Sequence, residues 1–230
     1  MYKYEMHVHT CPCSGAGGDI RGHIDTLIKN GFSGMVVTNH FYYGDTRIDR
    51  GLPWVEFVEA YKQDYHYGLE YAKTVDFDLL FGLEEHVGEG QEILLYGITP
   101  ELMAAHPELK EGSAEEFASV VHEAGGLVYQ AHPYRAASYI RDPNPLGCID
   151  MLDGIEVYNA GNRPEWNESA KRFAEEKGLK CTAGSDAHGV GSAGRAGILA
   201  KERIRTNEDL VRVLKSGEYE IFVNTNHISD

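Results

Sequence analysis

Short apolar runs with strand character alternate along this chain with helical patterns, and this order constrains the fold more than any other feature of the sequence. Such runs, bounded by turn-forming residues, are typical of strands. The predicted strands span residues 2–8, 33–39, 78–84, 92–98, 127–131, 154–158, 181–184, 197–200 and 219–223. The predicted helices cover residues 19–30, 53–74, 113–125, 165–177 and 206–215.

The repeated strand-then-helix order favours a parallel sheet covered by helices. The run Gly34-Met35-Val36-Val37 is apolar throughout, as expected for a strand buried on both faces. About seven or eight such units in one chain favour a barrel over an open sheet. A chain of 230 residues is long enough for one α/β domain, and no internal repeat or linker divides it, so we expect a single domain over residues 1–230.

The charge of the chain restricts its partners. A formal net charge of −15 disfavours a long nucleic acid, because binding to a phosphate backbone needs clustered Lys and Arg. A small phosphorylated substrate is compatible with this charge where bound metal ions reverse its sign locally. No apolar run reaches ~18 residues, and the N-terminus lacks the apolar core of a signal peptide. We therefore expect a cytoplasmic protein with no membrane partner, and four cysteines that are free thiols.

Histidines and acids recur where the predicted strands end. His7 and His9 lie two residues apart at the end of the first strand, and side chains at this spacing on a strand point the same way. Further strand ends carry His40, Glu84, His132, Asp186 and His188. Because the carboxyl ends of parallel strands in a barrel converge on one face, we expect these side chains to meet there.

This set of imidazoles and carboxylates indicates a metal centre. Such mixed ligands suit Zn, Mn, Fe or related divalent ions. A carboxylate such as Glu84 can also bridge two ions. Two metals about 3.5–4 Å apart stabilise both the attacking and the leaving oxygen in phosphoester hydrolysis. The residues therefore predict a hydrolase with a centre of two or more divalent ions.

Five short motifs along the chain resemble those of one enzyme family. The motifs HVHT, TNH, GLE, AHP and GSDAH occur in this order between His7 and His188, over most of the chain. They are similar to the motifs of the PHP (polymerase and histidinol phosphatase) family of metal-dependent phosphoesterases, and HVHT and GSDAH are the most specific of them. The resemblance implies a distorted (β/α)7 barrel and a phosphomonoesterase whose attacking water is bridged by two or three divalent metals.

The resemblance also assigns ligands to individual metals. It implies that one metal is held by His7, His9, Glu84 and Asp186. A second metal would be held by Glu84 with His132, and a third by His40 with His188.

The chain departs from the family pattern at three places. Asn39 stands where the family usually has Asp, and Cys13-Ser14-Gly15 where it often has an Asp or His. Glu92 stands where the family commonly has a His, and because a glutamate also ligates hard divalent ions, we predict Glu92 as a ligand. Because of the change at residues 13–15, the third metal lacks a ligand besides His40 and His188. Asp19 and Cys13 are candidates for this ligand. A Cys13 thiolate would favour zinc at this position.

Two arginines close to the motifs are candidates for substrate binding. Arg135 in AHPYR and Arg195 after GSDAH can each bind a phosphate through bidentate hydrogen bonds. Asp186 and His188 are the candidate catalytic residues, with a role in proton transfer. His86 lies two residues after Glu84 and is a weaker candidate for the site.

Two other functions fit the same ligand set. One is a metal-dependent amidohydrolase that cleaves a C–N bond. The other is a non-catalytic, metal-binding regulatory module, since PHP domains also occur attached to polymerases. Glu156 in GIEVYNA also resembles a recurrent family segment, and for this residue a site role and a structural role are both open.

Overall fold

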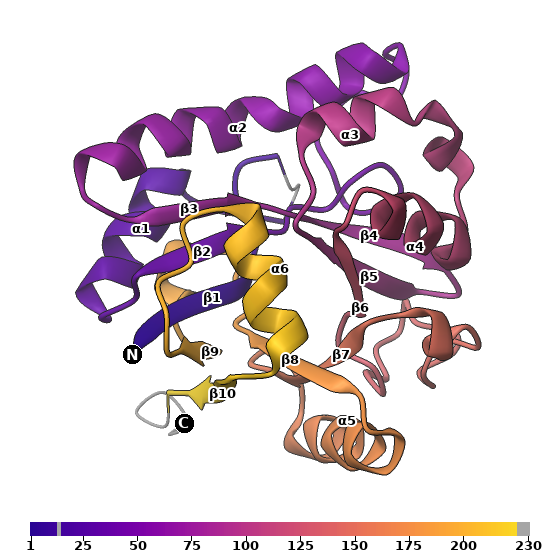
Figure 1. The fold of residues 1–230 in the computed structure, drawn as a ribbon. Coiled ribbons are helices and arrows are strands. Elements are labelled where there is room, and N and C mark those ends of the chain that lie inside the picture. The colour runs from indigo at the N-terminus through magenta and orange to yellow at the C-terminus, as the bar shows by residue number, and fades with distance from the viewer. Residues whose placement is uncertain (13–14, 225–230) are drawn as a thin grey trace.

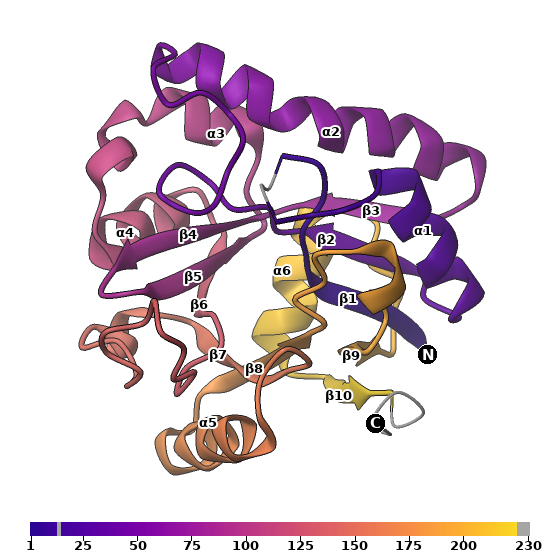
Figure 2. The same cartoon turned by 180° about the vertical axis from the view of Figure 1, so that it is seen from behind.

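The computed structural model describes residues 1–12 and 15–224 and has a mixed α/β fold with two five-stranded sheets (Figures 1 and 2). The sheets have the strand orders β10-β9-β1-β2-β3 and β4-β5-β6-β7-β8. The strands are β1 (Tyr2–Val8), β2 (Gly34–Val37), β3 (Asp78–Phe81), β4 (Leu83–Gly88), β5 (Gln91–Tyr96), β6 (Leu127–Gln130), β7 (Gly154–Asn159), β8 (Lys180–Gly184), β9 (Ala196–Ala200) and β10 (Tyr219–Val223). The predicted α/β class is confirmed, whereas a closed seven-stranded barrel is not.

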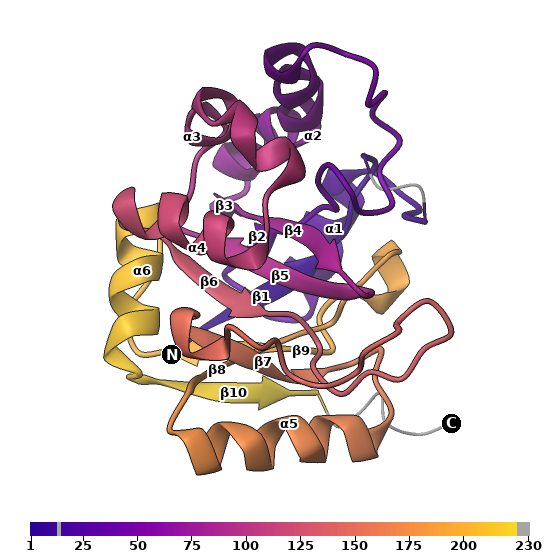
Figure 3. The same cartoon turned by 90° about the vertical axis from the view of Figure 1, so that its right-hand side faces the viewer.

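Six α-helices accompany the sheets in the described residues. They are α1 (Ile20–Lys29), α2 (Trp54–Thr74), α3 (Pro100–Ala105), α4 (Ala114–Glu123), α5 (Pro164–Lys177) and α6 (Asn207–Ser216). The long α2 lies on the opposite side of the molecule from α5 (Figures 1 and 3). The sequence did not predict α3, which is only six residues long and too short for an apolar periodicity. No helix in the described part of the chain is long and apolar enough to span a bilayer.

Both sheets are mixed, so the expectation of a parallel sheet was wrong in part. Strands β1, β2 and β3 pair in parallel, as do β6, β7 and β8, but β5 is antiparallel to β4 and β6, and β9 to β1 and β10. The β4–β5 hairpin turns at Gly88-Glu89-Gly90, where φ is 109°, 51° and 82°. Parallel strands need a long crossover, so a turn this short dictates an antiparallel pair.

One segment of the chain passes from the first sheet into the second at Gly82. The predicted strand 78–84 is in fact β3, which pairs with β2, followed by the start of β4, which pairs with β5. A Cβ atom at Gly82 would lie 2.7 Å from the Leu95 carbonyl oxygen and 2.8 Å from Val36, so a side chain does not fit here. The glycine thus permits the close approach at which the strand changes sheets.

The carboxyl ends of strands from both sheets meet at one end of the molecule. An isolated bridge joins Val8, at the end of β1, to Ala187, which follows β8. A second bridge joins His40, which follows β2, to Glu84 in β4. The sheets therefore converge where the sequence places most of the candidate site residues.

Apolar and tyrosine side chains fill the interior at the other end of the sheets. Tyr4 and Met6 of β1 pack with Tyr96 of β5 and Tyr129 of β6. The Tyr96 hydroxyl donates to the Met6 carbonyl oxygen at 3.1 Å and so links the two sheets. Helix α6 covers this cluster through Leu210, Val213 and Leu214. Side chains fill the interior at this end of the sheets, and the candidate site residues lie at the other end.

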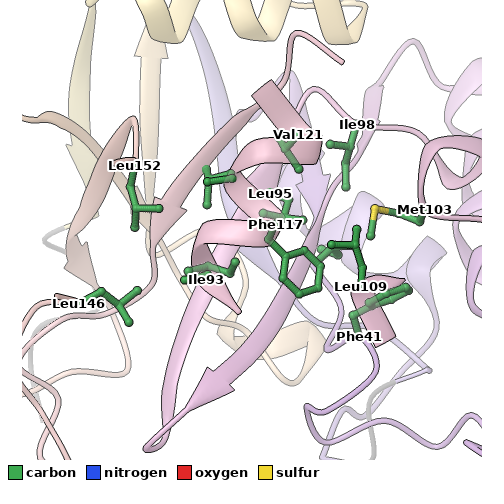
Figure 4. Close-up of a cluster of buried hydrophobic side chains, with 14 of the residues drawn as sticks. Phe41, Ile93, Leu95, Ile98, Met103, Leu109, Phe117, Val121, Leu146 and Leu152 are labelled. Atoms are coloured by element: carbon green, nitrogen blue, oxygen red, sulfur yellow. The ribbon is translucent and has the colours of Figure 1, made fainter. Parts of the chain in front are cut away.

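Helices cover the outer faces of the sheets with further apolar clusters. Phe117 and Val121 of α4 belong to one cluster with Ile93 and Leu95 of β5 (Figure 4). The outer face of the first sheet packs on α1 through Ile20, Ile24 and Leu27. Each large side chain buried in this way contributes about 1.5–3 kcal/mol.

A capping box stands at the start of α4. Ser113 Oγ accepts a hydrogen bond from the Glu116 backbone N–H at 3.3 Å, and Glu116 Oε2 accepts one from the Ser113 N–H at 2.7 Å. These bonds satisfy two donors that a helix start leaves without intrahelical partners.

We expect Ser113→Ala to lower the free energy of unfolding by about 1 kcal/mol, because it removes the side-chain acceptor of this cap. In a chain of this size the melting temperature should fall by about 2–4 °C, measurable by calorimetry. Ser169→Ala is the matched control, because that hydroxyl donates to the Glu165 carbonyl oxygen within α5, accepts a long bond from Arg172 Nη2 at 3.4 Å and caps no helix end. Equal destabilisation by the two substitutions would contradict the prediction.

Candidate metal centre

All eight predicted metal ligands lie together where the two sheets converge. They come from β1, β4 and β5 and from the segments that follow β1, β2, β6 and β8, and they are His7, His9, His40, Glu84, Glu92, His132, Asp186 and His188. Seven of these side chains are almost completely buried. The exception is His188, which is 37% exposed at the rim.

Glu84 lies at the middle of this group. Its Oε1 atom is 3.1 Å from His7 Nε2 and 3.0 Å from His132 Nε2. Its Oε2 atom is 3.0 Å from His40 Nδ1 and 3.4 Å from His9 Nε2. The two oxygens of one carboxylate therefore face two different pairs of imidazoles.

The other two carboxylates complete the group on either side of Glu84. Asp186 Oδ1 lies 3.2 Å from His9 Nε2 and 3.5 Å from His188 Nδ1. Glu92 Oε2 lies 3.3 Å from His132 Nε2. Each carboxylate thus faces at least one imidazole nitrogen that also belongs to the group.

The donor atoms fit divalent cations. Three overlapping triplets of ligand atoms each lie within 4.8 Å of one another in the described residues, namely His7–His9–Glu84, His40–Glu84–Glu92 and His9–His40–His188. Two ligand atoms bound to one cation at about 2.0–2.2 Å are themselves about 2.8–3.6 Å apart. The separations given above fall in this range. Moreover, Glu84 Oε2 is buried and accepts no hydrogen bond of good geometry, although two imidazoles face it.

The charges of the group act strongly on one another. Burial and the neighbouring His40 lower the pKa of His9 to about 3, so His9 is neutral, as a metal ligand must be. Burial also lowers the pKa of His40, but Glu84 and Glu92 outweigh it and raise this pKa to about 9. Burial raises the pKa of Glu84, yet His7 and His40 hold it well below its ordinary value. The carboxylates therefore form a focus of negative charge that attracts cations.

Glu156 is not one of the predicted ligands, but its carboxylate contacts two residues that are, His7 and His132. Its Oε1 atom is 3.0 Å from His7 Nδ1, the nitrogen that points away from Glu84. Its Oε2 atom accepts hydrogen bonds from the His132 backbone N–H at 3.0 Å and from Asn159 Nδ2 at 2.9 Å. A carboxylate on the second nitrogen of a histidine fixes the ring orientation and makes Nε2 a better ligand. The sequence left the role of Glu156 open, and the structure places it beside the site.

Two further buried carboxylates, which the sequence did not single out, hold the backbone around the group. Glu5 accepts hydrogen bonds from the N–H groups of Ser185 at 2.8 Å and Gly194 at 3.1 Å, which flank the Asp186 loop. Glu85 accepts the N–H groups of residues 42 and 43 at 2.8 and 2.9 Å. Burial raises the pKa of both acids to about 7. A signal in the sequence is that each acid lies close to a predicted ligand, Glu5 two residues before His7 and Glu85 directly after Glu84.

The backbone is strained at two of the predicted ligands. His132 has a φ of 27° and Asp186 a φ of 51°, in the region that favours glycine. Non-glycine residues in this region cost free energy and persist where the surrounding contacts hold them. Here the contacts are the Glu156 acceptor for the His132 N–H and a salt bridge from Arg135 to Asp186. Such positions cluster at functional sites.

Of the two predicted substrate-binding arginines, only Arg135 lies at the centre. Its Nη2 donates to Asp186 Oδ2 at 2.7 Å and to Asn159 Oδ1 at 2.9 Å, and its Nε donates to Asn162 at 2.7 Å. Arg195 is not among the residues that line the cavity described below. It directly precedes β9, its N–H donates to Ser185 Oγ, and its side chain lies near Tyr158.

Asp19 and Cys13 were the candidates for the missing ligand of the third metal. Asp19 is the N-cap of α1, where its Oδ1 accepts the Gly22 N–H at 2.9 Å, so it is not part of the group. Cys13 lies outside the described residues. Asn39 Oδ1 accepts the Thr10 N–H at 2.6 Å and so holds the segment after His9. The described cysteines, at positions 11, 148 and 181, are free thiols, as predicted.

A cavity of about 430 Å³ opens over the group. Its lining includes six predicted ligands, His40, Glu84, Glu92, His132, Asp186 and His188. The other residues that line it are Tyr43, Gly44, Asp45, His86, Arg135 and Tyr139. A concave site of this volume suits a small molecule.

The sequence matches a family profile over part of its length. A profile described as PHP-associated matches residues 164–219, from α5 to the start of β10. This segment includes Asp186 and His188. No curated protein matches the sequence of the chain.

Solved structures share this fold over nearly the whole chain. A candidate metal-dependent phosphoesterase from Bifidobacterium adolescentis is 17% identical, with a TM-score of 0.61 over 92% of this chain and 95% of that chain. A two-domain protein from Bacteroides vulgatus that contains a predicted PHP-like metal-dependent phosphoesterase is 15% identical, with a TM-score of 0.70 over 97% of this chain and 65% of that chain. An amidohydrolase from Chromobacterium violaceum, with bound sulfate and no metal, is 15% identical, with a TM-score of 0.61 over 98% of this chain and 99% of that chain.

The three lines of evidence agree. The motifs that resemble one family in the sequence carry seven of the eight side chains that meet here, all except Glu92. The matched segment carries the last of these motifs, and the fold is that of PHP-like proteins. The profile match and the shared fold therefore support the resemblance to the PHP family that the motifs indicate.

Proposed function

We propose that the protein is a cytoplasmic, metal-dependent phosphoesterase that hydrolyses small phosphomonoesters with two or three divalent ions, such as Zn, Mn or Fe. The observation that carries the proposal is the position of Glu84. Its Oε1 faces His7 and His132, and its Oε2 faces His9 and His40, at 3.0–3.4 Å. A carboxylate in this position suits a pair of ions that share it, and paired ions are the usual device for phosphoester hydrolysis.

The residues around the cavity divide the remaining work. When bound, the ions supply Lewis-acid activation of water and of the phosphoryl group. Arg135 is held by Asp186 and lines the cavity, so its guanidinium is placed to bind a phosphate oxygen. His188 Nδ1 lies 3.2 Å from the Asp186 carbonyl oxygen, which favours a proton on Nδ1 and leaves Nε2 as a ligand or proton acceptor. We assign proton transfer to His188 and Asp186.

Cleavage of a C–N bond is the second candidate function. The amidohydrolase from Chromobacterium violaceum shares the fold over the whole of its length. A pair of ions that activates water for attack on phosphorus also activates it for attack on an amide carbonyl. Substrate tests must therefore include an amide beside the phosphate esters.

We expect the purified protein, loaded with Mn²⁺ or Zn²⁺, to bind at least two ions per chain and to release phosphate from 4-nitrophenyl phosphate. His9→Ala should lose bound metal and lower kcat/KM by more than about 100-fold, because His9 Nε2 faces both Glu84 and Asp186. Elemental analysis and phosphate release measure the two effects. His66→Ala, an exposed histidine of α2, is the control. Fewer than two ions in the wild type would rule out the shared-carboxylate mechanism, and release of 4-nitroaniline from 4-nitroacetanilide instead of phosphate would favour the amidohydrolase.

We expect Glu156→Gln to lower metal affinity or activity by about 10–100-fold, because the amide no longer fixes the His7 ring with a full negative charge. Titration of the metal-free protein with Zn²⁺ measures the affinity. Glu123→Gln, on the exposed surface of α4, is the matched control. An unchanged zinc affinity in the Glu156 variant would show that this carboxylate is only structural.

The two arginines make a direct comparison. Arg135→Gln should raise KM for 4-nitrophenyl phosphate and lower kcat/KM by about 10–100-fold, because a charge-assisted contact to phosphate is lost. Arg195→Gln should leave both constants within about twofold, because Arg195 does not line the cavity. Steady-state kinetics on protein of verified metal content tests both. Equal losses in the two variants would mean that the effect is not local to the cavity.

A further inference from the structure

The cavity over the metal centre has a second group of lining residues that the proposed chemistry does not use. Besides the predicted ligands, the lining includes two tyrosines and a histidine, Tyr43, Tyr139 and His86, which we call the second side of the cavity. A phosphate bound at the ligands would direct the rest of its ester toward this side. The composition of this side therefore bears on which alcohol the protein accepts.

Tyr43 and Tyr139 present exposed aromatic rings at the cavity. Tyr43 is 47% exposed and Tyr139 is 57% exposed, which is high for large aromatic side chains. The backbone of Tyr43 is held by its N–H bond to the buried Glu85, and its ring packs edge-on against Tyr42 at 5.2 Å. The Tyr139 hydroxyl lies 3.4 Å from Arg135 Nη1. Tyrosines in fixed positions offer contact area to a ligand at low entropic cost.

His86 provides a hydrogen-bond donor of defined position. It lies on the same face of β4 as Glu84, two residues further along, and pairs across the hairpin with Glu92. Its Nε2 accepts the Gly90 backbone N–H at 3.1 Å, which places the proton of the neutral ring on Nδ1. Among the described residues, no hydrogen bond from this Nδ1–H is found. The strand spacing puts the ring roughly 6–7 Å beyond Glu84, past the reach of a phosphate at the ligands.

The charge on this side limits what else the ester can carry. Arg135 is the one arginine or lysine among the described residues that line the cavity, and its guanidinium already contacts Asp186. Asp45 and Glu92 also line the cavity. A second phosphate or a carboxylate on the alcohol would thus meet acids and no further cation.

We infer that Tyr43, His86 and Tyr139 form a subsite for the alcohol part of the ester, and that it takes an uncharged planar ring with a hydrogen-bond acceptor on its edge. The rings of Tyr43 and Tyr139 contact the planar face or edge of the ligand. The Nδ1–H of His86 donates to the acceptor. This inference rests on the proposed phosphomonoesterase function, because it assumes that a phosphate occupies the ligand side.

Three phosphonates that cannot be hydrolysed test the subsite by calorimetry on the Mn²⁺-loaded protein: cyclohexylmethyl-, benzyl- and 3-pyridylmethylphosphonate. The benzyl compound should bind about 3–10-fold more tightly than the cyclohexylmethyl compound, as expected for one aromatic contact. Under mildly alkaline conditions, where the pyridine is uncharged, the pyridylmethyl compound should gain a further factor of about 3–10 from the hydrogen bond.

Substitutions separate the two contacts. Tyr43→Leu and Tyr139→Leu should each reduce the preference for benzyl over cyclohexylmethyl. His86→Phe should abolish the preference for pyridylmethyl over benzyl and leave benzyl binding unchanged. Tyr67→Leu is the control, because Tyr67 on α2 is 46% exposed and does not line the cavity. All these side chains are at least partly exposed, so the variants should fold, which circular dichroism verifies.

The outcomes distinguish the subsite from the proposed function. Equal affinities for the three phosphonates, or preferences that survive the substitutions, would overturn the subsite even if benzyl phosphate is hydrolysed. The expected preferences without any hydrolysis of benzyl phosphate would support the subsite and refute the phosphoesterase. A failure to bind any of the phosphonates would overturn both.

Discussion

The arrangement of the candidate metal centre depends on the burial of one carboxylate, Glu84, where the two sheets converge. A buried charge is costly unless charged or polar groups surround it. Here each oxygen of Glu84 faces two imidazoles, at distances of 3.0–3.4 Å. These imidazoles come from β1, from the segments after β1 and β2, and from the segment after β6, so they belong to both sheets. The electrostatic requirement of one side chain thus couples the ends of several strands, and a shared cation would strengthen the same coupling.

A second layer of buried acids makes this arrangement rigid. Glu5, Glu85 and Glu156 do not belong to the triplets of ligand atoms, yet each accepts backbone N–H groups from a segment that carries a ligand. Hydrogen bonds from N–H groups to a buried carboxylate are stronger than neutral ones, so each acid fixes the path of its segment. In this way, the strained backbone at His132 and Asp186 is held in place. The negative charge of the chain is therefore concentrated, in part, where it serves to position ligands.

The sequence predicted most of the strands, and the eight side chains that gather where the sheets converge, because both depend on local patterns. β1 and β10 have the predicted bounds, and the His and acid residues follow apolar runs that can hardly be anything but strands. Strand direction was harder to predict, because it depends on partners far along the chain, and the antiparallel β4–β5 pair was not predicted. The position of Arg195 away from the cavity lining could not be predicted for a similar reason. Its nearness to a motif along the chain says nothing of where β9 leads it.

The apolar cluster under α6 explains why the fold tolerates a strained backbone at the site. The cluster of Tyr4, Met6, Tyr96 and Tyr129 under α6 joins the two sheets by apolar contacts and by the bond from the Tyr96 hydroxyl to Met6. These contacts hold the sheets together independently of the metal centre. The loops at the opposite end can therefore keep unfavourable φ values and mutually repelling carboxylates without loss of the fold. Stability and chemistry thus occupy opposite ends of the same strands, the usual division of labour in β/α architectures with their sites at the carboxyl ends.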